Sequence, residues 1–365
     1  TGPRTIACIF PSPNSAALPA PMTANRLTPA ASITSIELLN RLGSLHGHAG
    51  PEVIAELVVF LASDEARFIS ATEIRVDGAA LAWENGKSRL EAIGEVEEAA
   101  DLIRYYTHAM REHDGFEVPM QRFTEREVTT DVMRPYGVWT VIAPFNYPSA
   151  LAAGPAGAAL VAGNSVVLKP SLAGSLSGHR VYCALVDAGV PRGVVNLLTG
   201  GAEVGAALGH HPGVDGLTFT GSSEVGMSIL ADFSRSHPKP AICEMGGKNP
   251  VIVARSADLD LAVEGTVRSA FGFAGQKCSA ASRAYVDESL FDEFVERLVA
   301  RTEAIPGTSP LEPGGFLSPV INSAAVARYT AAVSDARLTG RVLTGGERLT
   351  DGHHERGHYL APTVA

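Results

Sequence analysis

Cysteine is scarce in this chain of 365 residues, which contains only Cys8, Cys183, Cys243 and Cys278. No two of these residues form a CxxC pair, and none has the spacing to cysteine or histidine that a zinc site requires. The scarcity excludes a disulfide-rich secreted domain and predicts free thiols in a reducing compartment. The cytoplasm is the default location for such a chain.

The chain also lacks a surplus of basic residues. Charged residues make up 19% of it, and its formal net charge is -10. This balance excludes the basic stripe that binds nucleic acid or an anionic membrane, so we expect neither partner. The N-terminus has no basic start followed by an apolar block, as a secretory signal would have.

No apolar run is long enough to cross a bilayer. The most apolar one, residues 151–162, is short and contains Gly154, Pro155 and Gly157. We predict that it forms a buried helix.

Five of the eleven histidines lie in two small groups, which are His210 with His211, and His353 with His354 and His358. We predict surface loops for both, because the first precedes a proline and the second lies in a polar stretch. A metal-binding histidine also needs an orienting partner, and no carboxylate-rich motif accompanies either group. The sequence therefore predicts no metal site.

The dinucleotide fingerprint GxGxxG is absent, so a phosphate-binding loop has to come from another motif. The segment Phe219-Thr-Gly-Ser-Ser-Glu-Val-Gly226 follows a strand pattern and opens a helical one. This order places the amides near Gly221 and Ser222 at a helix N-terminus, where an anion is favoured. The signal is weak alone, because glycine and serine are common in turns that bind nothing.

The chain is long enough, at 45% hydrophobic residues, for two domains or one large α/β unit. Strand patterns alternate with helical or Ala/Gly-rich segments at the repeat of βαβ units, which predicts a parallel sheet. The predicted strands of this sheet are residues 137–143, 165–169, 194–198, 216–220 and 240–244. A second series has strands at 250–254 and 283–286 and helices at 259–270, 290–302 and 323–337.

A further helix is predicted from Gly94 or Glu95 to Met110, because apolar residues recur on one face of it. The acidic residues of this segment, Glu95 among them, are expected to point away from that face.

The first 81 residues differ in character from the rest. Residues 1–34 are rich in proline and predict a disordered leader. Residues 35–81 contain a helical pattern at 51–63 and a strand pattern at 72–78, and they resemble the closing segment of short-chain dehydrogenases. The catalytic motifs of that family are missing, so we expect a packing appendage without activity.

One thiol lies in an open environment. Cys278 stands between Gly275-Gln276 and Ser279-Ala280, whose small and polar side chains leave the sulfur accessible. The other three cysteines are expected to be buried structural thiols, the usual state of a free cysteine. Glu244 ends an apolar strand pattern before two glycines, and Asn146 lies in the loop Pro144-Phe-Asn-Tyr-Pro148. A thiol, a mobile carboxylate and an amide predict covalent catalysis on a carbonyl.

These motifs, in this order along the chain, resemble those of the NAD(P)-dependent aldehyde dehydrogenase superfamily from about residue 82 to the end. The matching segments are Pro144-Phe-Asn-Tyr-Pro148, Gly163-Asn-Ser-Val-Val-Leu-Lys-Pro-Ser171, Phe219-Thr-Gly-Ser-Ser-Glu-Val-Gly226, Glu244-Met-Gly-Gly-Lys248 and Gly275-Gln-Lys-Cys278. The local sequence around Cys278 is most similar to that of one branch of the superfamily. This branch oxidises glutamate semialdehyde, the open form of 1-pyrroline-5-carboxylate, in proline catabolism.

The resemblance implies a catalytic set. Cys278 is the expected nucleophile, and the side-chain amide of Asn146 with the backbone N–H of Cys278 is expected to stabilise the oxyanion. Glu244 is expected to activate the water that hydrolyses the thioester, although a strand-end ion pair with Lys248 is the alternative. Ser279 is expected to help bind the distant carboxylate of the substrate, or to serve only as a small spacer.

The resemblance also implies cofactor contacts at strand ends and helix starts of the first domain. These are Ile142, Pro144, Phe145, Lys169, Ser171, Gly201, Gly205, Gly221, Ser222 and Val225. Lys169 is expected to hold the adenosine ribose, and a solvated strand-end cation is the alternative. Leu172 stands where members that prefer NAD often have an acid, so NADP is not excluded, but we expect NAD.

The predicted fold is therefore α/β, with a parallel-sheet dinucleotide-binding domain at 82–243 and an α/β catalytic domain at 244–365. The family chain normally continues well past residue 365, so we expect a truncated catalytic domain. Full-length members form homo-oligomers, a state that the shorter chain need not share.

Three alternatives remain open. One is a weakly active or non-catalytic fragment of such an enzyme, and another is a dehydrogenase for a different aliphatic aldehyde or semialdehyde. The third is a cysteine hydrolase or acyltransferase that uses Cys278 without a cofactor.

Overall fold

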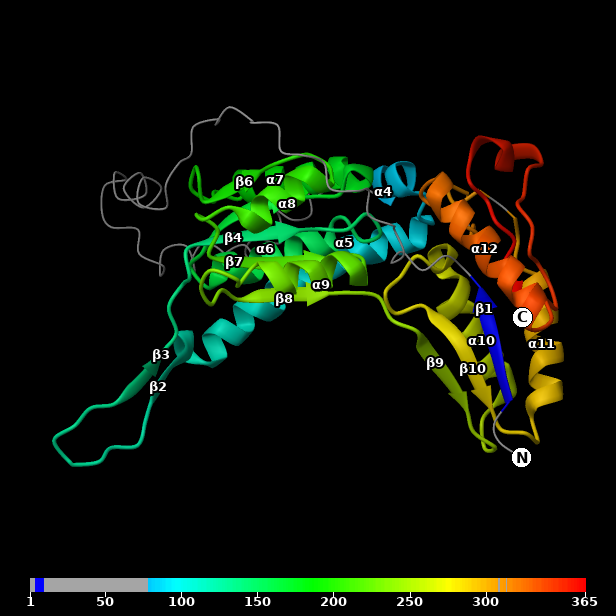
Figure 1. Cartoon of the computed structure of the whole chain (residues 1–365), viewed down its shortest axis with the longest axis horizontal. Coiled ribbons are helices and arrows are strands. Elements are labelled where there is room, and N and C mark those ends of the chain that lie inside the picture. The colour runs from blue at the N-terminus through cyan, green and yellow to red at the C-terminus, as the bar shows by residue number, and fades with distance from the viewer. Residues whose placement is uncertain (1–3, 10–77, 308, 313) are drawn as a thin grey trace.

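A computed structural model describes residues 4–9, 78–307, 309–312 and 314–365 (Figure 1). The helix and strand predicted within residues 35–77 lie outside this description. The described chain forms two lobes, each built on its own sheet, and a hairpin that projects from the first lobe.

The first lobe is built on a five-stranded parallel sheet, as the alternating pattern predicts. Its strand order is β6-β5-β4-β7-β8. The strands are β4 (Val138–Ile142), β5 (Ser165–Lys169), β6 (Val195–Leu197), β7 (Gly216–Thr220) and β8 (Ala241–Glu244). Two of them have the predicted bounds, and the other three are shorter than predicted by one or two residues at one or both ends.

Helices cover both faces of this sheet. The connecting helices are α6 (Ala150–Val161), α7 (Ser175–Asp187), α8 (Ala202–His210) and α9 (Ser223–Asp232). Because crossovers between parallel strands are right-handed, α6 and α7 lie on one face and α8 and α9 on the other. The apolar side chains of β4 alternate accordingly. Trp139 and Val141 belong to the core under α6, and Ile142 packs against the cluster under α9.

The apolar segment after the first strand is a buried helix, as predicted, and Pro155 lies inside it. Among the helices of the described chain, none combines the length and the apolar character needed to cross a bilayer.

Two helices precede the sheet, α4 (Gly78–Asn85) and α5 (Arg89–Glu112). Helix α5 begins about five residues earlier than predicted, because the Oγ of Ser88 accepts a hydrogen bond from the amide of Glu91 at 3.3 Å and caps it. The expected exposure of Glu95 is wrong. Its side chain is buried against Lys87, which supplies the opposite charge.

The second lobe contains a four-stranded sheet in the order β11-β1-β10-β9, covered by α10, α11 and α12. Its elements are β9 (Asn249–Val253), β10 (Ala281–Val286), β11 (Thr363–Val364), α10 (Leu259–Phe271), α11 (Phe291–Glu303) and α12 (Ser323–Thr339). The strands β9 and β10 are parallel, whereas β1 is antiparallel to both of its neighbours.

The strand β1 (Arg4–Ile9) corrects the prediction that residues 1–34 are disordered throughout. Ile6 and Cys8 alternate with less buried neighbours, and both side chains enter the core of the second lobe. The two ladders of β1 pair it with β10 and with β11. The sequence did not predict this strand for two reasons. The alternation of buried and less buried residues covers only six positions and is followed by many prolines. The partner strands lie far away in the sequence.

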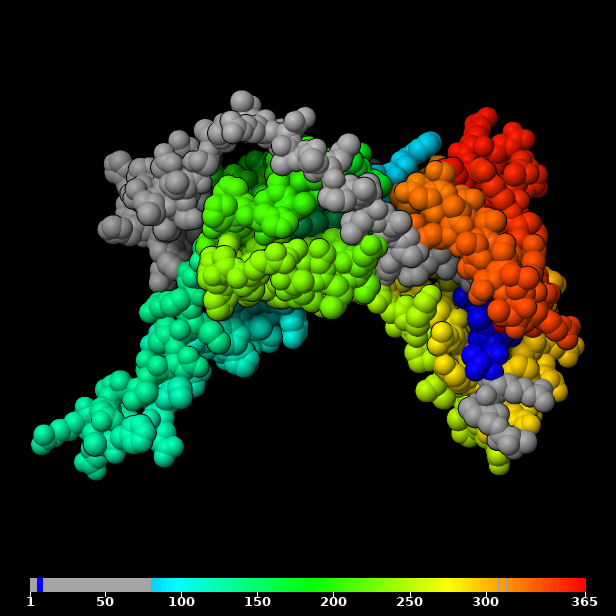
Figure 2. Space-filling view, in the orientation of Figure 1, coloured from blue at the N-terminus to red at the C-terminus, as the bar shows by residue number. Residues whose placement is uncertain are grey.

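The hairpin of β2 (Glu117–Pro119) and β3 (Thr130–Val132) was not predicted from the sequence. It follows the short 3-10 helix η2 (Asp114–Phe116) and stands clear of the first lobe (Figures 1 and 2). Its side chains are almost all exposed, including Phe123 at 99%.

Candidate active site

The carboxyl ends of the parallel strands gather most of the predicted site residues at one edge of the first sheet. Ile142, Lys169 and Glu244 are the last residues of β4, β5 and β8. The register pairs Ile142 with Lys169 and, on its other side, with Phe219, the residue before the last of β7. The strand order reverses at β4, and ligands of open α/β sheets bind at such a point beyond the strand ends.

The predicted oxyanion donor lies beside residues 272–280, which carry Cys278 and are called the thiol loop below. The Nδ2 of Asn146 donates a hydrogen bond to the carbonyl oxygen of Gln276 at 2.8 Å, and the Oδ1 accepts one from the amide of Tyr147 at 3.1 Å. Asn146 is 5% exposed, so these bonds fix its orientation. The loop after β4 and the segment two residues before Cys278 are thereby joined across the two lobes.

Gln276 anchors the thiol loop to the second lobe. Its side chain is buried, and its Nε2 donates to the carbonyl oxygen of Pro319 at 3.2 Å. Its Oε1 accepts from the amide of Ile321 at 2.9 Å. The sequence placed Gln276 in the motif without a role. In the structure, the buried side-chain amide of Gln276 satisfies the hydrogen-bonding groups of the backbone at Pro319 and Ile321.

The thiol loop begins with the tight 3-10 turn η4 (Gly272–Gly275), in which Phe273 and Ala274 have φ of 51°. Positive φ is costly for residues other than glycine, so this turn is held in place by its surroundings. Cys278 and Ser279 are exposed after it, as the open environment predicts for the thiol. The Nδ2 of Asn249 donates to the carbonyl oxygens of Cys278 at 2.7 Å and Ala280 at 3.1 Å.

Asn249 also connects the segment after Glu244, the predicted base, to the loop of Cys278, the predicted nucleophile. Glu244 ends β8, and the short segment after it leads to Asn249 at the start of β9, where the thiol loop is bound. The carboxylate of Glu244 is exposed, and its charge adds to burial in raising the pKa of the Cys243 thiol. Among the described residues, no ion pair joins Glu244 to Lys248, in contrast to the alternative considered for this carboxylate.

The predicted anion site begins α9 directly after β7. The Oγ of Ser222 accepts a hydrogen bond from the amide of Val225 at 3.3 Å and caps the helix. The amide of Gly221 donates to the carbonyl oxygen of Glu244 at 3.0 Å, so it supports β8 instead of facing solvent. A Cβ at Gly226 would lie 2.6 Å from the sulfur of Met245, so a larger residue there would force the Met245 side chain, in the segment after Glu244, to move.

Lys169 is not a solvated cation. Its side chain is buried, its Nζ donates to the carbonyl oxygen of Pro170 at 3.3 Å, and burial lowers its pKa while Glu203 acts against that change. A Cβ added to Gly205 would lie 3.7 Å from the Cε of Lys169 and 3.9 Å from the Cδ1 of Ile142. The structure therefore brings three predicted cofactor residues together.

The remaining predicted cofactor residues lie around the same strand ends. The Oγ of Ser171 accepts a hydrogen bond from the amide of Ala173 at 3.3 Å and begins the turn η3 (Leu172–Gly174). Gly201 precedes α8, and its amide donates to the Oε1 of Glu203 at 3.2 Å. Pro144 and Phe145 lie in the loop of Asn146. The carbonyl oxygen of Phe145 accepts from the side chain of Asn85 at 3.2 Å. Leu172 is 62% exposed.

Sequence reasoning missed a cluster of buried and half-buried charged side chains that contacts the thiol loop. Lys87 and Glu95 form an ion pair with both side chains fully buried, and Lys277 pairs with Glu91 at 2.7 Å. The Nζ of Lys87 lies 3.4 Å from the ring centroid of Tyr147. The sequence did contain a signal for this cluster. Lys87 precedes the helix cap, and two acids, Glu91 and Glu95, follow it one helical turn apart.

His354 corrects the prediction that the histidines lie on the surface. It is 7% exposed, its Nδ1 lies 2.9 Å from the Oδ1 of Asp351, and its Nε2 lies 3.1 Å from the carbonyl oxygen of Gly307. In the described part of the chain, no three histidine, cysteine or acidic side chains lie together as metal ligands would.

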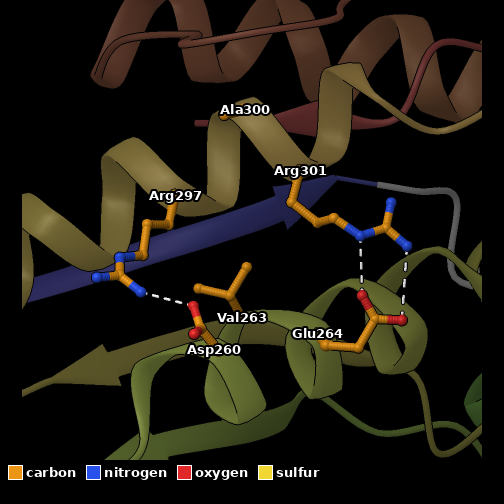
Figure 3. A pocket seen from close by; sticks show the side chains of 6 residues that line it. All are labelled: Asp260, Val263, Glu264, Arg297, Ala300 and Arg301. Atoms are coloured by element: carbon orange, nitrogen blue, oxygen red, sulfur yellow. Dashed lines mark hydrogen bonds and ion pairs between the residues drawn. The ribbon is translucent and has the colours of Figure 1, made fainter.

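A shallow pocket lies between α10 and α11, away from every predicted site residue (Figure 3). Arg297 reaches Asp260 at 2.5 Å and Arg301 reaches Glu264 at 2.8 Å across it. The charged groups that line it are thus already paired, and we assign no function to it.

Comparison with known proteins shows the family to which this chain belongs. The model of the aldehyde dehydrogenase family matches residues 77–365. The chain belongs to the aldehyde dehydrogenase family, whose members are NAD(P)-dependent. It is 39% identical over 288 residues to the 1-pyrroline-5-carboxylate dehydrogenase of Geobacillus sp. (strain WCH70), a match that covers 77% of this chain and 55% of that protein. The chain thus spans about half the length of that relative.

Solved structures agree with this membership. An Escherichia coli NADP-dependent enzyme superposes with a TM-score of 0.80 at 31% identity, over 90% of this chain and 66% of that one. A betaine aldehyde dehydrogenase from Staphylococcus aureus, solved with NAD+, gives a TM-score of 0.80 at 27% identity, over 90% of this chain and 64% of that one. Both nicotinamide cofactors therefore occur among the similar structures.

Proposed function

We propose that this protein oxidises an aldehyde to a carboxylic acid through a thioester on Cys278, with a nicotinamide cofactor. The observation that carries the proposal is the hydrogen bond from Asn146 to the carbonyl oxygen of Gln276. It holds an amide donor beside the thiol loop, where the oxygen of an attacked carbonyl would become negative.

The residues at the strand ends fit a dinucleotide. The capped N-terminus of α9 favours a phosphate, and Lys169 is a buried cation that makes no ion pair in the described structure. Gly205 adds no side chain at this point, where a Cβ would contact the side chains of Lys169 and Ile142. When bound, the oxidised nicotinamide accepts a hydride from the substrate carbon.

The protein's own groups carry the other steps. The thiolate of Cys278 adds to the aldehyde carbon, and the oxygen of the thiohemiacetal takes the negative charge, which Asn146 and the backbone N–H of Cys278 stabilise. Loss of hydride leaves a thioester. Glu244 takes a proton from water, the water attacks the thioester carbon, and the C–S bond breaks to return the thiolate and release the acid.

We propose glutamate semialdehyde as the substrate, which would place the enzyme in proline catabolism and in the cytoplasm. The name of the Geobacillus relative supports this choice, as does the exposed Ser279 beside the thiol, where a hydroxyl could bind a distant carboxylate. Other aliphatic aldehydes and semialdehydes are the alternatives. A substrate panel decides, because faster turnover of a plain aliphatic aldehyde than of the semialdehyde contradicts the choice.

A chain that has this fold but does not turn over aldehyde is the second candidate. The edge strand β9 favours it, since Ile252 on that strand is 77% exposed. The experiment follows nicotinamide reduction at 340 nm with the chain alone and with the chain extended by a relative's C-terminal segment. Equal rates in a monodisperse short chain would exclude this candidate. A product formed without nicotinamide reduction would indicate a cysteine hydrolase.

A further inference from the structure

A buried ion pair lies directly behind the two loops of the candidate site. Lys87 is in the connection between α4 and α5, and its Nζ donates to the Oε2 of Glu95 on α5. Neither side chain is exposed to solvent. Burial lowers the pKa of Lys87 and raises that of Glu95, and each charge opposes the change in its partner. Burying two charges is costly unless their remaining hydrogen-bonding groups are also satisfied.

The second oxygen of Glu95 binds the start of α6. The Oε1 accepts hydrogen bonds from the amides of Ser149 at 2.6 Å and Ala150 at 3.2 Å. A carboxylate at the N-terminus of a helix is favoured by the helix dipole and satisfies amides that lack a partner. These amides directly follow the loop of Asn146, so Glu95 fixes the point at which that loop enters the helix.

The cation of Lys87 connects the same loop to the thiol loop. Its Nζ lies 3.4 Å from the ring centroid of Tyr147, the residue after Asn146, and 5.0 Å from that of Phe273. A desolvated ammonium over an aromatic ring is attracted by the ring quadrupole. One buried cation therefore contacts both loops, one from each lobe.

The thiol loop needs such support. Phe273 and Ala274 have left-handed backbone conformations, which residues other than glycine adopt only where neighbouring groups hold them. A second ion pair reaches the loop from the same helix, because Lys277 contacts Glu91 at 2.7 Å. The turn that presents Cys278 is thus held through α5 as well as through Asn146.

We propose that Lys87 and Glu95 are positioning residues, which set the separation of Asn146 and Cys278 by holding both loops at once. Neither residue touches the reacting atoms in this assignment. The kinetic part of the proposal rests on the proposed function, whereas the structural part does not. The pair acts on the rate of the chemical step, because misplacing reacting groups by about 1 Å costs on the order of 100-fold in rate.

The test compares four forms of the full chain. The main variant is the double substitution Lys87→Met with Glu95→Gln, which removes both charges together and keeps an acceptor for the amides of Ser149 and Ala150. Lys87→Arg retains a cation and serves as the conservative rescue. The double substitution Arg104→Met with Asp101→Asn is the matched control, because it removes an exposed ion pair from the same helix.

Two measurements are made on each form. Steady-state kinetics should give a fall in kcat of about 100-fold for the main variant, with KM for the cofactor within about twofold, and partial recovery in Lys87→Arg. Hydrogen exchange should become faster in peptides covering residues 144–150 and 272–279 together, with β5 and β10 unchanged. The control should match the wild type in both measurements.

Each other outcome decides the matter as well. Unchanged kcat and unchanged exchange in both loops would overturn the proposal, and faster exchange throughout the chain would reduce the pair to a general structural role. If the wild type does not oxidise aldehydes, the proposed function fails. The exchange measurement alone then decides whether Lys87 and Glu95 hold the two loops.

Discussion

Asn146 donates a hydrogen bond of 2.8 Å to the carbonyl oxygen of Gln276, and this bond joins the loop after β4 to the loop of Cys278. A side-chain amide has two N–H donors, and this bond uses one of them. The second is available to a substrate oxygen. The proposed oxyanion donor is therefore oriented by the loop that carries the proposed nucleophile.

Asn146→Ala removes the predicted side-chain donor to the oxyanion. We expect kcat to fall by about 100- to 1,000-fold, because loss of one such donor costs that much in other acyl-transfer sites. Cofactor affinity, measured by nucleotide fluorescence, should stay within about twofold. Asn196→Ala is the control, since that exposed amide also binds a backbone carbonyl, but at β6. An Asn146→Ala enzyme as fast as the control would remove Asn146 from the mechanism.

Cys278→Ser replaces the proposed nucleophile with a far weaker one. Aldehyde oxidation should fall to the detection limit of the 340 nm assay, and cofactor binding should remain measurable by fluorescence. Cys183→Ser, on α7, is a matched thiol substitution outside the site and should keep full activity. Unchanged turnover in Cys278→Ser would contradict the covalent mechanism.

Glu244→Gln separates oxidation from hydrolysis. Without the carboxylate, water is not activated, so the thioester should accumulate after one burst of reduced cofactor, about one equivalent per active site. Rapid-mixing absorbance measures the burst, and mass spectrometry of the quenched protein detects the acyl group. Glu296→Gln on α11 is the exposed control. A normal steady-state rate in Glu244→Gln would assign the hydrolysis to another group.

Leu172→Glu should change the choice of cofactor. Leu172 is 62% exposed in the turn that follows Lys169, where a carboxylate would accept a hydrogen bond from a ribose hydroxyl and repel a 2′-phosphate. Repulsion between close charges near a surface is on the order of 1–4 kcal/mol, so the ratio of kcat/KM for NAD to that for NADP should rise at least about tenfold. Leu338→Glu, on the exposed face of α12, should leave the ratio unchanged.

Cys8 should make the protein less stable at alkaline pH. Burial raises the pKa of its thiol to about 12 in the folded state, whereas an unfolded thiol titrates near about 8.5. The stabilising effect is complete below the unfolded pKa and is lost as the pH rises towards the folded pKa, because only the unfolded chain releases the proton. The loss should approach about 1.4 kcal/mol per pH unit.

The measurement is the free energy of unfolding in urea from pH 8 to pH 11. Its difference between wild type and Cys8→Ala isolates the thiol from the tyrosines that titrate in the same range. That difference should shift steadily in favour of Cys8→Ala as the pH rises. Cys183→Ala is the control. A constant difference for Cys8→Ala would mean that β1 does not bury this thiol.

Local sequence patterns predicted those strands whose residues and boundaries can be recognised within a single short segment. The strands ending at Lys169 and Thr220 have the predicted bounds, because alternating or continuous apolar residues stop there at a proline or a glycine. The order of the motifs also predicted that Asn146, Glu244 and Cys278 belong to one site. The structure adds the hydrogen bonds that bring their segments together.

Among the features that were not predicted from the sequence, one is the burial of a charged side chain, and another is a strand whose partners are distant in the sequence. A glutamate on a helix is normally exposed, and Glu95 is buried because Lys87 and two amides satisfy its carboxylate. The strand β1 could not be predicted, because its alternation extends over six residues and both of its partner strands lie more than half the chain away.

The separation in sequence between β1 and its partner strands also affects how the second sheet folds. Ala7 pairs with Arg283 and exchanges two backbone hydrogen bonds with Ala365, at 2.8 and 2.9 Å. A long loop has to close before these bonds form, whereas each strand of the other sheet pairs with a strand much nearer in the sequence. The pairing of β1 is therefore expected to be a late step in the folding of the lobe that carries the thiol loop.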